Sequence, residues 1–156
     1  MTKICFVCHG NICRSTMAEF VMKDLVKKEG LENQFYIQSR ATHRDELGAD
    51  THWGTREKLD QEGIPYSKRK ATLMTKEDYG QYDYILGMDE ENIRYIDSII
   101  GDDPEHKVHM LMDYAGEHRR INDPWYTGNF DDTFRDVMRG CKGLFKNIIK
   151  KRNNIK

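Results

Sequence analysis

The 156-residue sequence predicts a single α/β domain over residues 1–156, with a four-stranded, parallel, twisted sheet flanked by helices on both faces. Two observations support this fold class. Short apolar segments alternate with segments of helical periodicity, and strands separated by helices form parallel sheets. The C-terminal segment carries a long apolar stripe at helical spacing. The length is sufficient for a substantial core, and no repeat, linker or low-complexity segment divides the chain.

Four short apolar segments are predicted as strands. The first covers residues 4–7 and runs directly into a polar loop. The second covers residues 35–37 and is followed by a polar loop over residues 39–50. The third lies within residues 82–88, and the fourth covers residues 108–112. Continuous apolar runs are typical of strands that a parallel sheet buries on both faces.

Helices are predicted between and after these strands. The first covers residues 15–28 and the second residues 51–62, and glycine follows each of them as a helix terminator. A third helix covers residues 90–100. The last helix has one apolar stripe, formed by Phe130, Phe134, Val137, Met138, Cys141, Leu144, Phe145, Ile148 and Ile149.

Composition excludes several classes of protein. The 25 basic and 26 acidic residues leave a net charge of −1, so bulk electrostatics favour neither nucleic acid nor membrane binding. No stretch reaches the length of a transmembrane helix, and the N-terminus is predicted as a strand rather than a signal peptide. Four cysteines without an export signal indicate reduced thiols. We therefore expect a soluble cytoplasmic protein.

The segment from Cys8 to Ser15 joins the first strand to the first helix and combines three anion-binding features. Unpaired N–H groups at a helix start carry partial positive charge and bind anions. The same field favours the thiolate form of a cysteine. The planar guanidinium of Arg14 matches two phosphate oxygens. The sequence therefore predicts a phosphate-binding loop after the first strand, with Cys8 as a nucleophile.

Other interpretations of this loop are weaker. A Cys-x5-Arg spacing also occurs by chance around thiols that are simply buried. A Walker phosphate loop is excluded, because no Gly-Lys-Ser/Thr follows. Structural zinc ligands usually stand two to four residues apart, whereas Cys8 and Cys13 are further apart and no second ligand pair follows them. We expect no metal and no cofactor.

A thiolate can displace a phosphate ester only when the leaving oxygen is protonated or already stable. The best candidate acid is Asp123, which precedes proline and then Trp125 and Tyr126. These rings could flank an aromatic substrate and exclude water from the carboxyl group. Most Asp-Pro pairs merely start turns, and Asp103 forms a second such pair, but its surroundings are wholly polar.

The loop at 8–15 and the segment at 123–126 together resemble the low-molecular-weight protein tyrosine phosphatases. The similarity runs nearly end to end and includes Ser39, residues 75–78 and residues 82–89. The resemblance implies a four-stranded parallel sheet flanked by helices. It also implies hydrolysis of phosphotyrosine and aryl phosphate monoesters through a phosphocysteine intermediate.

The resemblance assigns Cys8 as the nucleophile, Arg14 as the phosphate clamp and Asp123 as the proton donor that later activates water. It implies that Ser15 donates a hydrogen bond to the Cys8 sulfur. The positions expected to bind phosphate or substrate are His9, Gly10, Asn11, Ile12, Cys13, Arg14, Ser15, Trp125 and Tyr126.

Supporting positions follow from the same resemblance. Asn11 and Ser39 match residues that brace the loop, with Asn11 in an unusual backbone conformation. The family pairs Cys13 with the nucleophile in a reversible disulfide, which protects a reactive thiolate. The alternative for Cys13 is a small residue that fills the underside of the loop. Cys5 and Cys141 are expected in the core.

The sequence also departs from the family pattern. Thr16 stands where many relatives have proline at the helix start, which should alter rigidity more than chemistry. Asp45, followed by Glu46, stands where relatives often present an aromatic wall of the substrate cleft. This acid could weaken selection for phosphotyrosine or repel acidic peptides. Trp53 could compensate, although a surface or core position is equally compatible.

Three rival functions fit the sequence less well. An arsenate reductase of this fold needs two further cysteines near residues 80–90, and none is present there. Phosphoarginine phosphatases carry threonine where this chain has Ile12, which suits an aromatic ring better. A non-catalytic phosphate-binding module would have lost Cys8, Arg14 or Asp123. We therefore expect a monomeric enzyme that takes a tyrosine-phosphorylated protein or small aryl phosphate and releases inorganic phosphate.

Overall fold

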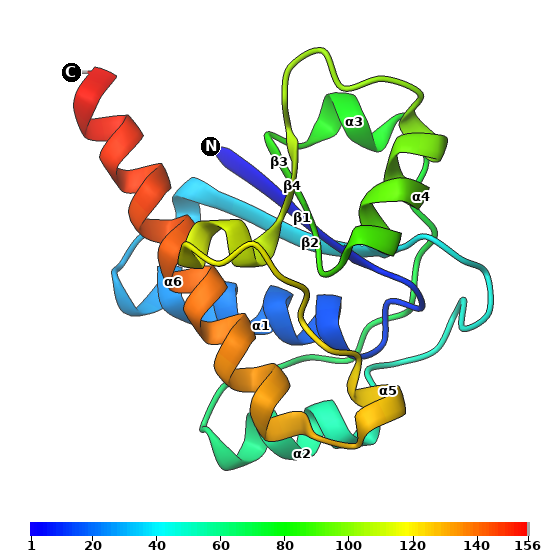
Figure 1. Ribbon diagram of the computed structural model, residues 1–156. Helices are drawn as coiled ribbons and strands as arrows, with labels where there is room; N and C mark the ends of the chain where they lie inside the picture. Colours follow the sequence, from blue (N-terminus) through cyan, green and yellow to red (C-terminus); the bar gives the residue numbers. More distant parts are fainter. Residues whose placement is uncertain (156) are drawn as a thin grey trace.

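A computed structural model describes residues 1–155 and contains one sheet of four parallel strands in the order β2-β1-β3-β4 (Figure 1). The predicted fold class is confirmed. The strands are β1 (Thr2–Cys8), β2 (Phe35–Ala41), β3 (Tyr84–Gly87) and β4 (Val108–Met110). The helices are α1 (Arg14–Lys28), α2 (Trp53–Gln61), α3 (Asp78–Gln81), α4 (Glu90–Ile100), α5 (Pro124–Thr127) and α6 (Phe130–Ile155), with 3₁₀ turns η1 (Glu32–Gln34) and η2 (Leu111–Ala115).

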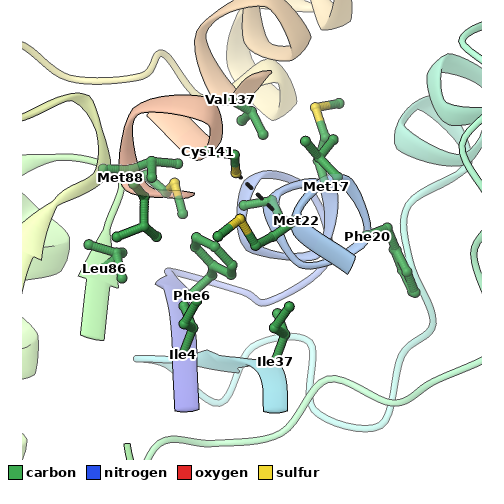
Figure 2. Packing of buried hydrophobic residues seen from close by; sticks show 14 of the residues in the cluster. Ile4, Phe6, Met17, Phe20, Met22, Ile37, Leu86, Met88, Val137 and Cys141 are labelled. Carbon is green, nitrogen blue, oxygen red and sulfur yellow. Dashed lines mark hydrogen bonds between the residues drawn. The ribbon is translucent and has the colours of Figure 1, made fainter. Parts of the chain in front are cut away.

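Alternate residues of β1 supply the two halves of the core, because successive strand side chains point to opposite faces. Ile4 and Phe6 are fully buried in the cluster with α1 and α6, whereas Cys5 and Val7 are buried with α4 on the other face. Figure 2 shows strand side chains pointing toward α1 and α6, where the Cys141 thiol donates to the Ala18 carbonyl at 3.8 Å. The prediction that Cys5 and Cys141 belong to the core is confirmed.

The parallel sheet also determines where a site can form. The carboxyl ends of parallel strands meet at one edge, and ligands bind beyond that edge. β1 ends at Cys8 and β3 ends at Gly87, two residues before Asp89. The loop between β1 and α1 and the loop after β3 therefore approach each other from neighbouring strands.

Several predicted boundaries were wrong. The second strand does not end at residue 37 but continues to Ala41, because β2 pairs with β1 over its whole length, up to the Cys8–Ala41 pair. Ser39 therefore lies within a strand and not in a polar loop. The fourth strand stops at Met110, and Leu111 begins η2. Within residues 1–155, no helix is long and apolar enough to cross a membrane.

Candidate active site

A cleft of about 480 Å³ opens at the carboxyl end of β1, between the loop that follows Cys8 and the segment that precedes α5. The chain after β2 fixes the first part of this loop. The carbonyl of Cys8 accepts a hydrogen bond from the Thr42 N–H at 3.0 Å, and the carbonyl of His9 accepts one from the His43 N–H at 3.1 Å. The backbone at Cys8 and His9 is therefore tied to the chain that follows β2.

Asn11 adopts the left-handed conformation that the resemblance implied, with φ of 59°. Its side-chain oxygen accepts hydrogen bonds from the Arg69 guanidinium and, at 3.0 Å, from the Thr72 N–H. Its amide nitrogen donates to Ser15 Oγ at 2.9 Å. Arg69 and Thr72 could not be identified from the sequence, because they lie 58 and 61 residues from Asn11 and carry no local motif.

This chain of hydrogen bonds ends at Cys8, the predicted nucleophile. Ser15 Oγ lies 3.0 Å from the Cys8 sulfur and already accepts from Asn11. A hydroxyl has a single hydrogen to donate, and the Asn11 bond leaves that hydrogen free for the sulfur. Ser15 is therefore placed to donate to a Cys8 thiolate, as the resemblance implied.

Arg14 is buried at the start of α1, with 3% of its surface exposed. Nη1 donates to Asp89 Oδ2 at 2.7 Å and to the Ile121 carbonyl at 2.9 Å, whereas Nη2 lies 3.5 Å from Asp123 Oδ2. Burial alone would lower the pKa of Arg14, but Cys8, Asp123 and Asp89 outweigh it and raise this pKa. The guanidinium is thus a permanent cation that carboxylates hold against the cleft.

Asp123 combines a position in the cleft with a structural contact. Its Oδ1 accepts from the Trp125 N–H at 3.0 Å and caps α5, which begins with proline at its first position. Its Oδ2 faces Arg14. Asp103, the other Asp-Pro residue, lies outside the cleft and accepts hydrogen bonds from Tyr79 and Lys107 instead.

At the rim of the cleft, the imidazole of His9 lies beside Asp45. Asp45 Oδ2 lies 2.7 Å from His9 Nε2, and this hydrogen bond lowers the pKa of Asp45. The His9 ring stacks on His43 with centroids 3.9 Å apart, and His43 meets the edge of Tyr95 at 4.4 Å. Both His9 and Asp45 line the cleft, so the acid positions a flat ring at its rim.

The remaining predicted substrate positions also line the cleft. Gly10, Ile12 and Cys13 come from the loop, and Trp125 and Tyr126 come from α5 with 54% and 85% of their surfaces exposed. Trp53 does not line this cleft but a neighbouring groove. Its predicted compensation for Asp45 is therefore not seen.

Ser39 and Cys13, the two remaining residues predicted to support the loop, lie close to α1. The Ser39 hydroxyl donates to Glu19 Oε1 at 2.5 Å, so the hydrogen bonds that position Asn11 come from Arg69 and Thr72 rather than from Ser39. Cys13 precedes α1, and burial raises the pKa of its thiol. Thr16 donates to the Cys13 carbonyl at 2.9 Å, a contact that proline could not make.

Fold and site together define the class of protein, which is an α/β phosphatase with its phosphate loop after the first strand. The chain belongs to the low-molecular-weight protein tyrosine phosphatase family. The sequence profile of that family, described as low molecular weight phosphotyrosine protein phosphatase, matches residues 3–154.

Individual relatives agree with this assignment. The low-molecular-weight protein-tyrosine-phosphatase YfkJ of Bacillus subtilis is 36% identical over 154 residues, which cover 97% of this chain and 99% of YfkJ. The crystal structure of YfkJ has a TM-score of 0.93, with 97% and 96% of the two chains covered. The low-molecular-weight protein tyrosine phosphatase SP-PTP of Streptococcus pyogenes has a TM-score of 0.85 at 36% identity, with 94% and 93% covered. PtpA of Staphylococcus epidermidis is 34% identical, with 98% and 97% covered.

Proposed function

We propose that the protein hydrolyses phosphotyrosine and aryl phosphate monoesters through a phosphocysteine on Cys8, with Asp123 as the general acid and then the general base. One observation carries this proposal. The thiol, the buried Arg14 and Asp123 line the same cleft, and the Ser15 hydroxyl lies 3.0 Å from the sulfur. These are the nucleophile, the anion clamp, the acid and the leaving-group donor that ester displacement requires.

In the first step, the Cys8 thiolate attacks phosphorus as the P–O bond to the phenol breaks. Asp123 gives its proton to the departing oxygen, which leaves as the neutral phenol. Arg14 Nη1 is occupied by Asp89 and Ile121, so Nη2, with one contact at 3.5 Å, is the group that turns to the phosphate. Loop N–H groups bind the other equatorial oxygens.

In the second step, Asp123 takes a proton from water, which attacks the phosphocysteine. The S–P bond breaks, inorganic phosphate is released, and Cys8 returns to the thiolate. The Ser15 hydroxyl stabilises that thiolate as a leaving group by donating its hydrogen, which the bond from Asn11 leaves free. Asp89 pairs with Arg14 at 2.7 Å and holds the clamp between the two steps.

Substrate comparison tests this function. We expect p-nitrophenyl phosphate to be hydrolysed without added metal, and a phosphotyrosine peptide to have a higher kcat/KM than matched phosphoarginine and phosphoserine peptides. Ile12 and the exposed rings of Trp125 and Tyr126 favour a flat aromatic group in the cleft. A higher kcat/KM for phosphoarginine would contradict the proposed substrate class, and absence of hydrolysis would contradict the proposed enzyme activity.

We also propose that Cys13 protects the nucleophile. Peroxide oxidises the Cys8 thiolate to a sulfenic acid, and the Cys13 thiol condenses with it to form a disulfide and water. Burial keeps Cys13 protonated and unreactive until that moment.

Peroxide inactivation measures this protection. We expect activity lost to peroxide to return after treatment with dithiothreitol in the wild-type enzyme, and to return to a clearly smaller extent in Cys13→Ser. Activity with p-nitrophenyl phosphate is measured before and after each treatment. Equal recovery in the two proteins would show that Cys13 only fills the underside of the loop.

A further inference from the structure

A second groove of about 560 Å³ lies beside the active cleft, between the start of α2 and the region where α5 meets α6. Figure 1 shows α2, α5 and the start of α6 near one another at one end of the molecule. Its floor is aromatic. The His52 ring lies 5.4 Å from Trp53 and 5.6 Å from Phe130, in stacked orientations, and meets Trp125 edge-on at 5.6 Å. Trp53 is 63% exposed, so an indole face is open to a ligand.

The groove is fixed relative to the phosphate loop. The His52 N–H donates to the Ile12 carbonyl at 2.9 Å, which ties the start of α2 to the loop that follows Cys8. A Cβ at Gly54 would lie 2.4 Å from the Phe130 ring, so glycine allows this ring to pack against the first turn of α2. Trp125 lines both the groove and the active cleft. A substrate that extends from the cleft past Trp125 therefore enters the groove.

The charges in the groove favour a cation. Lys58 is paired with Asp131 at 2.7 Å and with Glu62 at 3.2 Å. Glu57 also lines the groove and forms no ion pair among the described residues. It stands four residues after Trp53 on α2, so the two side chains share one face of the helix.

The remaining titratable group of the groove, His52, is neutral and does not repel a cation. His52 Nδ1 accepts a hydrogen bond from the Gly54 N–H at 3.0 Å, which requires this nitrogen to be unprotonated. Burial, reinforced by Arg56, lowers the pKa of His52. The rim of the active cleft carries Asp45, Glu46 and Glu91, against Arg120 and against His9, which is bonded to Asp45, so carboxylates outnumber bases on the approach to the groove.

We propose that this groove binds an arginine side chain of the phosphoprotein substrate, a few residues along the chain from the phosphotyrosine. The proposal rests on the proposed function of the adjacent cleft. The guanidinium stacks on the indole of Trp53 and pairs with the Glu57 carboxylate, a combination that suits the planar arginine cation. The groove thereby selects among phosphotyrosine sequences that the cleft alone does not distinguish.

Steady-state kinetics with phosphotyrosine peptides tests the proposal. Each peptide carries a single arginine, citrulline, leucine or glutamate among alanines, at one position from four residues before to four residues after the phosphotyrosine. We expect arginine to raise kcat/KM about fivefold over alanine at one position or two adjacent positions. Citrulline has the shape of arginine but not its charge, and it should not reproduce this gain. Leucine and glutamate should not reproduce it either.

Two variants connect the gain to the groove. Trp53→Ala and Glu57→Gln should each remove most of the arginine preference and leave kcat/KM for p-nitrophenyl phosphate unchanged. Glu29→Gln, which makes the same charge change at the far end of α1, should keep the preference. The inference would be overturned if leucine raised kcat/KM as much as arginine, or if the arginine preference survived in Trp53→Ala. Either result would leave the phosphatase function standing. Failure to hydrolyse p-nitrophenyl phosphate would overturn both.

Discussion

Replacing Cys8 with serine is expected to lower kcat for p-nitrophenyl phosphate at least about 10⁴-fold, because a serine hydroxyl beside Ser15 has no base to activate it. The loop N–H groups and Arg14 remain in place, so the variant should still bind a phosphotyrosine peptide with a Kd within a few-fold of the wild-type KM. Stopped-time turnover assays measure the first quantity, and isothermal titration calorimetry with the peptide measures the second.

A second cysteine variant, Cys141→Ser, is the matched control that distinguishes loss of the proposed nucleophile from loss of a thiol elsewhere in the protein. Cys141→Ser changes a thiol that is buried between α6 and α1 and does not line the cleft. We expect this variant to keep its kcat, even where its Tm falls because a hydroxyl replaces a buried sulfur. Full turnover in Cys8→Ser would exclude the phosphocysteine intermediate.

Replacing Asp123 with asparagine is expected to lower kcat for phenyl phosphate by about 10²- to 10⁴-fold. Asparagine can still accept from the Trp125 N–H and cap α5, so the change removes the proton donor with little effect on the local fold. The loss should be smaller for dinitrophenyl phosphate, whose leaving group needs less protonation.

Asp103→Asn is the control for this prediction. Asp103 also precedes proline, but its carboxylate organises the loop before β4 through Tyr79 and Lys107. We expect this variant to lose stability and to retain its dependence on the leaving group. Equal kinetic losses in the two variants, or a loss in Asp123→Asn that is independent of the leaving group, would reject Asp123 as the acid.

Elements with a strong local pattern could be predicted from the sequence. The helix at 90–100 matches α4 residue for residue, and the apolar stripe from Phe130 onward identifies α6. The extension of β2 to Ala41 could not be predicted in this way, because backbone pairing with β1 and not side-chain polarity decides it. The short helix α5 depends on a cap by Asp123, which local sequence makes possible but does not require.

The site residues also fall into two groups, those that lie in local motifs and those that only tertiary contacts bring to the site. Cys8, Arg14 and Asp123 lie in recognisable motifs, so their residue types and the resemblance to a family were sufficient to predict them as site residues, and all three line one cleft. Asp89, Arg69 and Thr72 were not identified as site residues, because their contacts with Arg14 and Asn11 exist only after distant segments meet. Ser39 was assigned to the loop through the resemblance, whereas its hydroxyl donates to Glu19 on α1.

The contacts that hold Arg14 join segments that are far apart in the sequence, which bears on how the domain folds. The three partners of Arg14, which are Asp89, Ile121 and Asp123, follow it by 75, 107 and 109 residues. Contacts of such sequence separation form late, because a long loop must close before they contribute any stability. An incomplete or partly folded chain therefore contains the whole loop motif without its phosphate clamp. We therefore expect activity to appear during refolding only after the segment that carries Ile121 and Asp123 has docked against Arg14.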